Sequence, residues 1–135
     1  MKKLICCLLF GALAVVMNAN EASATSDINK TFIAKYNVKE PKTDSEKALS
    51  ALAAKAKCNV CHIGKKKKDR NEFGQAIAKL VDKDEMKALK SAKKTEELTK
   101  MITDALNKVE KEKNKAGKTF GELIKAGKLP GGEPK

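Results

Sequence analysis

Cys58-Asn59-Val60-Cys61-His62 is the segment that decides how the rest of this chain is interpreted. Two cysteines separated by two residues and followed at once by histidine form the C-x-x-C-H pattern of covalent haem c attachment. Two thiols one helical turn apart can each form a thioether with a vinyl group on one edge of a haem. The segment therefore predicts one covalently bound haem c, with Cys58 and Cys61 as its anchors and His62 as the proximal axial ligand of the iron.

Three other kinds of site use cysteines at this spacing, and the sequence supports each of them less well. A thioredoxin-like C-x-x-C follows a strand and begins a helix, and no strand pattern flanks this segment. A structural zinc site has four ligands, but the sequence contains no second pair of cysteine or histidine residues. A plain disulfide stays open in an oxidising compartment, although it gives no role to His62, the single histidine of the chain.

Residues 1–24 have the three parts of a secretory signal peptide. A short basic stretch precedes an uncharged run over residues 4–16, and small residues suitable for cleavage follow at Ala22–Ala24. The uncharged run is shorter than the roughly 18–20 apolar residues of a membrane-spanning helix. We therefore expect cleavage after Ala24, the loss of Cys6 and Cys7 with the signal peptide, and no membrane span in the mature protein.

Export agrees with the haem hypothesis, because haem is attached to C-x-x-C-H segments outside the bacterial cytoplasm. The expected location is the periplasm or an equivalent extracytoplasmic compartment. Residues 25–128 have the size of one domain and are expected to form the monohaem domain. Residues 129–135 contain two prolines and two glycines, and they are expected to form a flexible tail.

Lysine dominates the charge of the chain, which has 29 basic and 17 acidic side chains and a net charge of +12. Arg70 is the only arginine and tryptophan is absent, so recognition of bases by bidentate arginine and stacked aromatic rings is disfavoured. We expect no nucleic-acid partner. A lysine-rich surface suits salt-sensitive encounters with acidic redox proteins, and the run Lys65–Lys68 directly follows the haem segment, although such a run is most often only a solvated loop.

The remaining sequence predicts helices and no strands. Capping boxes of the form T-x-x-E begin helices at Thr43 and Thr119, and the first of these helices is expected to run directly into Cys58. Apolar periodicity predicts four further helices over residues 26–36, 71–81, 85–93 and 95–109, with caps from Ser26 or Asp27, Asn71 and Thr95. The expected fold is all-α, with about five helices packed around one covalently bound haem.

Aromatic residues are scarce in the mature chain, which has Tyr36 and three phenylalanines, Phe32, Phe73 and Phe120. A buried haem would supply the large apolar surface that these side chains do not provide. The chain without haem is therefore expected to be poorly ordered.

These features resemble the c-type cytochromes, specifically small exported bacterial monohaem cytochromes related to class I. Within that group the resemblance is carried by Lys57–His62, the lysine run, Arg70–Gly74 and Thr119–Pro130. It implies a cytochrome c-like domain that carries single electrons between redox partners. No second histidine is present to act as a distal acid or base, so the chain is not expected to be an enzyme.

The sixth ligand of the iron is where the chain departs from class I, whose members supply a methionine from a downstream loop. Only Met86 and Met101 are available in the mature chain. Met101 lies on an apolar helix face, where methionine usually packs, and Met86 lies near a helix start. A lysine, Tyr36 or an open position are the alternatives. An open position would suit nitric oxide or carbon monoxide, which some similar proteins bind as heterodimers with a distal cysteine that this chain lacks, so a homo- or heterodimer stays open.

Overall fold

The computed structural model describes residues 20–66 and 68–133, with the backbone alone for residues 20–26. The expected signal peptide therefore lies mostly outside the described residues. Within them the chain forms six α-helices and one short 3₁₀ helix and no strands, which confirms the all-α class. The elements are α1 (Asn20–Lys35), α2 (Asp44–Ala56), η1 (Lys57–Val60), α3 (Glu72–Leu80), α4 (Lys83–Ser91), α5 (Thr95–Val109) and α6 (Phe120–Lys125).

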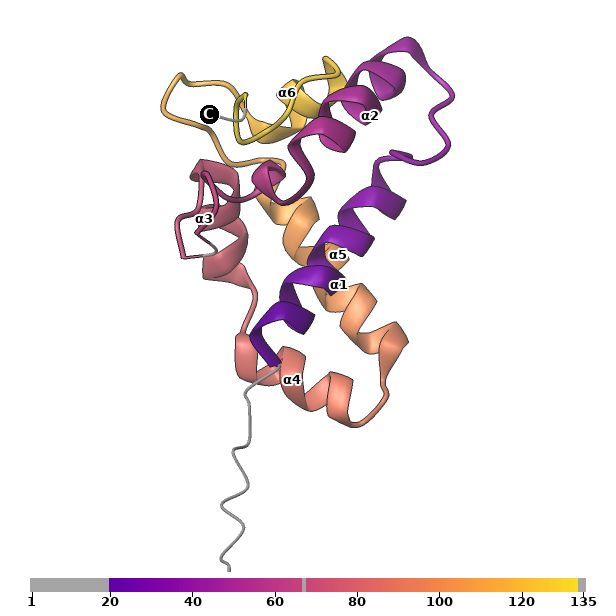
Figure 1. Cartoon of the computed structure of the whole chain (residues 1–135), viewed down its shortest axis with the longest axis vertical. Coiled ribbons are helices and arrows are strands. Elements are labelled where there is room, and N and C mark those ends of the chain that lie inside the picture. Colours follow the sequence, from indigo (N-terminus) through magenta and orange to yellow (C-terminus); the bar gives the residue numbers. More distant parts are fainter. Residues whose placement is uncertain (1–19, 67, 134–135) are drawn as a thin grey trace, which may run out of the picture.

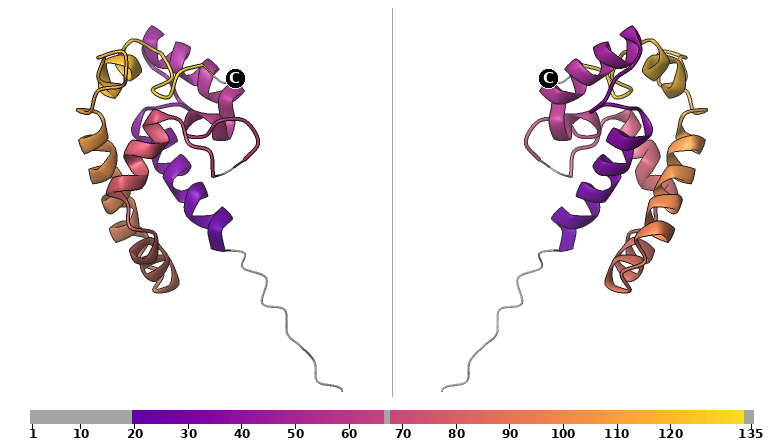
Figure 2. Two further views of the ribbon diagram at one scale, coloured as in Figure 1. Left: turned by 90° about the vertical axis from the view of Figure 1, so that its left-hand side faces the viewer. Right: turned by 90° about the vertical axis from the view of Figure 1, so that its right-hand side faces the viewer.

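The helices are arranged around α5, which contacts α1, α3 and α4 (Figure 1). α1 and α5 cross near the middle of the molecule, and α4 lies at one end, where it contacts both of them. α2 and α6 pack together at the other end (Figure 2). Because η1 continues from α2 and contacts it, the C-x-x-C-H segment lies in the half of the molecule that contains α2 and α6, away from α4 (Figure 1).

Three helix starts agree with the caps predicted from the sequence. Thr43 and Thr119 each form a full capping box. The threonine hydroxyl accepts a hydrogen bond from the backbone N–H of the glutamate three residues later, and the carboxylate of that glutamate accepts one from the backbone N–H of the threonine. Asn71 caps α3 by accepting a hydrogen bond from the backbone N–H of Gly74. These local bonds satisfy backbone donors that a helix leaves open in its first turn.

Two predicted caps are wrong. α1 begins at Asn20, so neither Ser26 nor Asp27 is its first residue, and Asp27 instead forms an ion pair with Lys90 of α4 at 2.8 Å. α5 has Thr95 as its first helical residue, and the preceding Lys94 makes no side-chain cap. α5 is stabilised without such a cap, because the side chains of its apolar face are buried in the core.

The domain also extends further than expected at its C-terminal end. Leu129 is 4% exposed and Pro130 is fully buried, although residues 129–135 were expected to form a flexible tail. Gly127, with φ +70, allows the chain to turn after α6 and approach Ser45 and Ala48 of α2. The boundary at residue 128 is therefore too early, since the packed structure includes Leu129 and Pro130.

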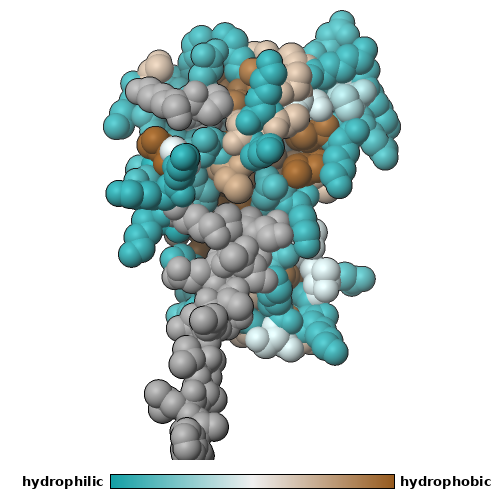
Figure 3. All heavy atoms as spheres, viewed as in Figure 1, coloured by the Kyte–Doolittle hydropathy of each residue, from teal (hydrophilic) through white to brown (hydrophobic). Residues whose placement is uncertain are grey.

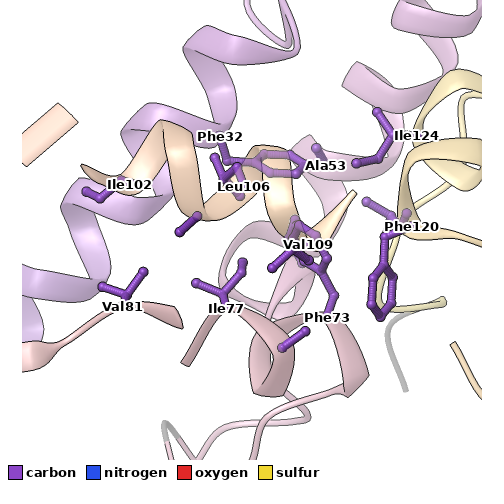
Figure 4. Close-up of a cluster of buried hydrophobic side chains, with 14 of the residues drawn as sticks. Phe32, Ala53, Phe73, Ile77, Val81, Ile102, Leu106, Val109, Phe120 and Ile124 are labelled. Carbon is purple, nitrogen blue, oxygen red and sulfur yellow. The ribbon is translucent and has the colours of Figure 1, made fainter. Parts of the chain in front are cut away.

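The core is a row of aromatic rings surrounded by aliphatic side chains of α3 and α5 (Figure 4). The ring centroid of Phe73, which is fully buried, lies 5.9 Å from that of Phe32 and 5.4 Å from that of Phe120. Tyr36 continues the row, 4.8 Å from Phe32. Tilted and edge-on contacts at these distances are favourable, so the four rings join α1, α3 and α6.

The visible surface is mainly hydrophilic, with small apolar areas between the charged side chains (Figure 3). Of the helices in residues 20–66 and 68–133, none combines the length and the apolar character needed to cross a membrane.

Candidate functional site

The C-x-x-C-H segment forms a single tight turn. The backbone N–H groups of Cys61 and His62 both donate to the carbonyl of Cys58, at 3.3 Å and 3.1 Å. Both cysteines are free thiols. Cys58 is exposed, Cys61 is half-buried and His62 is 8% exposed. The turn therefore holds one accessible thiol, one partly covered thiol and a buried imidazole.

A sharp change of backbone direction at Lys57 separates this turn from α2. α2 ends at Ala56, and Lys57 has φ 51 and ψ −117, a conformation that residues with a Cβ rarely adopt. The prediction that the helix runs directly into Cys58 is therefore wrong. The reversal at Lys57 redirects the chain at the start of η1, which contains Cys58 and is followed directly by Cys61.

The turn packs tightly against the start of α3. The backbone N–H of Asn71 donates to the carbonyl of Cys61 at 3.1 Å. A Cβ on Gly74 would lie 2.0 Å from that same carbonyl oxygen, so only glycine allows this approach. Asn71 and Gly74 belong to the Arg70–Gly74 segment of the resemblance, and the structure gives both a role at the turn.

The lysine run lies in a loop that leaves the turn and returns to it. His62 and Arg70 form an isolated antiparallel bridge, and the N–H of Ile63 donates to the carbonyl of Asp69 at 2.9 Å. The described lysines of the loop are all exposed, namely Lys65, Lys66 and Lys68. Ile63 is also 48% exposed at the base of the loop. A positively charged loop with one apolar side chain thus borders the site.

Burial strongly affects the chemistry of one thiol. Removal from water raises the pKa of Cys61 to about 12, the nearby Cys58 raises it as well, and Arg70 acts in the opposite direction. At neutral pH the Cys61 sulfur therefore carries its proton. Since a thiolate is the reactive form of cysteine, the exposed Cys58 is the more reactive of the two.

The donor set fits a haem better than a shared metal ion. Among the described side chains, no three His, Cys, Asp or Glu residues gather closely enough to hold one metal ion. A zinc site needs its ligands to converge on a single point. Haem c needs something different, because the two thiols bond to the edge of the ring while the imidazole approaches the iron. The Cys58–His62 turn offers these groups without requiring them to converge.

The two methionines considered as distal ligands lie in other parts of the molecule. Met86 is 2% exposed in the core and belongs to α4, away from the half of the molecule that contains η1 (Figure 1). Met101 is half-buried on α5 and lines a surface cavity of about 350 Å³, and the residues of that cavity do not include the cysteines or His62. The structure thus brings the cysteines and His62 together but brings neither methionine to them.

Tyr36, the other residue considered as a ligand, has a different partner. Its hydroxyl donates a hydrogen bond of 2.7 Å to Glu110. Burial raises its pKa above the ordinary value, and the hydrogen bond and charge of Glu110 raise it further. The phenolate that could bind iron is therefore strongly disfavoured.

The contacts that Asn71 and Gly74 make at this site are not visible in the sequence. The sequence predicts Asn71 as a helix cap and places both residues in the Arg70–Gly74 segment of the resemblance, but it gives neither of them a contact with the turn. Their contacts join positions that are distant in the chain, so neither spacing nor composition could reveal them. Comparisons with known protein families, with curated proteins and with solved structures found no match to this chain.

Proposed function

We propose that this chain is an exported monohaem c-type cytochrome that carries single electrons between redox proteins. The observation that supports this most strongly is the turn from Cys58 to His62, in which two free thiols at positions i and i+3 are followed by a buried imidazole. Covalent attachment of haem needs this order and spacing of groups.

The residues of the turn have separate tasks in this proposal. Cys58 and Cys61 would hold the haem through thioether bonds, and His62 would bind its iron on one face. Bound haem supplies one-electron redox chemistry through its iron. Burial of His62 limits the access of water to the imidazole, and the hydrogen bond from Asn71 to the Cys61 carbonyl keeps the turn against α3.

The loop after His62 would serve in the encounter with a partner. Lys65, Lys66 and Lys68 are exposed beside the site, and their charges would attract an acidic redox protein to this end of the molecule. Electrostatic attraction of this kind speeds association and weakens as salt is added. The rate of electron exchange with an acidic partner should therefore fall as ionic strength rises.

A second candidate function is the binding of a small gas such as nitric oxide or carbon monoxide. The observation that favours it is the location of Met86 on α4, at the end of the molecule away from the turn (Figure 1). If neither methionine reaches the iron, the distal position is open to a small ligand.

The visible absorption spectrum of the purified exported protein distinguishes these proposals, recorded oxidised and reduced, with and without carbon monoxide. A sulfur-to-iron charge-transfer band with no response to carbon monoxide supports an electron carrier with a methionine ligand. A spectrum that shifts with carbon monoxide supports gas binding. Haem bands that are absent altogether overturn both proposals.

Two variants serve as controls for the assignment of residues. The double variant Cys58→Ser/Cys61→Ser should lose covalent haem, so that haem is extracted by acidified organic solvent. His62→Ala should keep the haem attached but lose the spectrum of the nitrogen-ligated iron. An unchanged spectrum in His62→Ala would contradict the proximal assignment.

A further inference from the structure

The side chain of Asn71 lies at the centre of the contacts between the C-x-x-C-H turn and the rest of the protein. It is 7% exposed, although asparagine is usually found at the surface. Its Nδ2 group donates to the carbonyls of Asn59 and Val60, at 3.2 Å and 3.0 Å. These are the two residues between the cysteines.

One residue thus binds three consecutive carbonyl groups of the turn. The side-chain amide of Asn71 donates hydrogen bonds to the carbonyls of Asn59 and Val60, and its backbone N–H donates one to the carbonyl of Cys61. The Oδ1 atom accepts from Gly74 and fixes the orientation of the amide, because its other end must then be the donor. Every polar group of the Asn71 side chain is used.

The C-terminal segment covers this amide. A Cβ on Gly131 would lie 2.0 Å from Nδ2 and 2.7 Å from Oδ1 of Asn71. The backbone at Gly131 therefore packs directly against the amide group, and the buried Leu129 and Pro130 precede it in the chain. Shielding from water makes these hydrogen bonds costly to break, since a buried carbonyl left without a donor is not compensated.

We infer that Asn71 is a positioning residue for haem attachment: it holds the backbone between Cys58 and Cys61 so that both thiols and the His62 imidazole keep their relative positions. This inference rests on the proposed haem-binding function and deepens it. It also assigns a task to the segment from Leu129 to Gly131, which closes over the Asn71 amide.

The test must separate this role from simple capping of α3. Asn71→Ser keeps an oxygen that can accept from the Gly74 N–H, but it lacks the amide that donates to both carbonyls. Gly131→Ala keeps Asn71 and forces its amide to move. Asp82→Ala is the matched control, because Asp82 caps α4 by accepting from two backbone N–H groups, at the end of the molecule away from the turn.

Two readouts are measured on the full exported chain as isolated. The first is hydrogen exchange of the Cys61 and His62 backbone amides, and the second is the amount of covalent haem per chain from the pyridine haemochrome absorbance. Asn71→Ser and Gly131→Ala should exchange these amides at least about tenfold faster than the parent chain. Both variants should also bind several-fold less haem, while Asp82→Ala should match the parent in both readouts.

Unchanged exchange in both variants would overturn the inference, and so would faster exchange with undiminished haem. If Asn71→Ser does not fold, Gly131→Ala decides by the same two criteria. A parent chain without haem would instead contradict the proposed function, and the exchange rates would still report whether Asn71 holds the turn. The two failures are therefore distinguishable.

Discussion

Tyr36 donates a hydrogen bond of 2.7 Å to Glu110 and so joins the end of α1 to the end of α5. The same carboxylate forms an ion pair with Lys35 at 3.0 Å, in which both side chains are less than one-third exposed. Lys35 also donates to Asn107 at 2.7 Å. This cluster fixes the crossing of the two helices at the aromatic end of the core.

Glu110→Gln should destabilise the protein by about 1 kcal/mol at pH 7, because the ion pair with Lys35 is lost. Burial raises the pKa of Glu110, but hydrogen bonds from Tyr36 and Lys35 outweigh that effect and hold the pKa below its ordinary value of 4.5. A carboxylate with a lowered folded pKa stabilises the protein above 4.5 and loses this contribution as pH falls through the folded pKa. The difference between the two proteins should therefore shrink below that pH.

Denaturant unfolding at pH 7 and at about pH 3 measures this difference. Glu112→Gln is the control, because Glu112 is exposed and its carboxylate has none of these contacts. An equal loss of stability in Glu110→Gln at both pH values would contradict the role of the charge.

Gly74→Ala should destabilise the protein by more than about 2 kcal/mol, since the added methyl group overlaps the carbonyl of Cys61 and overpacking is costly. Gly121→Ala is a matched control in another helix, where the nearest atom to the new Cβ is 3.0 Å away. We expect the control to lose less than about 1 kcal/mol in thermal unfolding. A loss of stability in Gly74→Ala as small as that in the control would show that α3 can shift away from the turn.

Lys57→Gly should stabilise the protein by roughly 1 kcal/mol, because glycine adopts φ 51 and ψ −117 without the strain that a Cβ imposes. The relief of strain outweighs the greater freedom that glycine gives to the unfolded chain. Lys55→Gly, at an exposed position inside α2, should instead destabilise by about 1 kcal/mol. Unfolding midpoints that fall in both variants would contradict strain at Lys57.

The two cysteines should differ in their reaction with iodoacetamide in the chain that carries no haem. Cys58 is exposed, whereas burial raises the pKa of Cys61 to about 12, so Cys61 is protonated at pH 8. Mass spectrometry of peptides at short times should find the label on Cys58, and unfolding in urea should make the rates similar. Equal rates in the native chain would contradict the burial of the Cys61 thiol.

The row of aromatic rings predicts a folded chain before haem is bound, in contrast to the expectation from the scarcity of aromatic residues. The double variant Cys58→Ala/Cys61→Ala should keep a helical circular dichroism spectrum and a cooperative thermal transition. Phe73→Ala in that background should lose about 3–5 kcal/mol, because Phe73 is the fully buried centre of the row. A non-cooperative transition in the double variant would show that the core needs the cofactor.

Local patterns in the sequence were sufficient to predict most of the helices. The capping boxes at Thr43 and Thr119 and the apolar stripe of α5 depend on residues three or four positions apart, and all three were found as predicted. The same is true of the cap at Asn71. Such signals act within one helical turn and depend little on distant parts of the chain. The single cap residues predicted at Ser26 or Asp27 and at Thr95 were less informative, because one residue carries less information than a paired capping box or a full apolar stripe.

The features that shape the site were not predictable in this way. The reversal at Lys57 goes against the preference of the residue itself, since lysine rarely has positive φ, and the turn that follows it is bonded to the start of α3. The amide of Asn71 reaches carbonyls eleven and twelve positions away. Burial of Pro130 depends on a surface formed by earlier parts of the chain. Each depends on contacts that exist only after the helices have assembled.

If the chain is exported as proposed, the separation of Phe32, Phe73 and Phe120 along the sequence has a consequence for its passage across a membrane. A chain that is threaded through a channel from its N-terminus presents Phe32 first and Phe73 later, and the ring contact between Phe73 and Phe120 cannot form until Phe120 has emerged. Contacts between such distant positions form late and slow the final collapse. The polypeptide would therefore stay unfolded during translocation, and its core would be completed only after it had crossed the membrane.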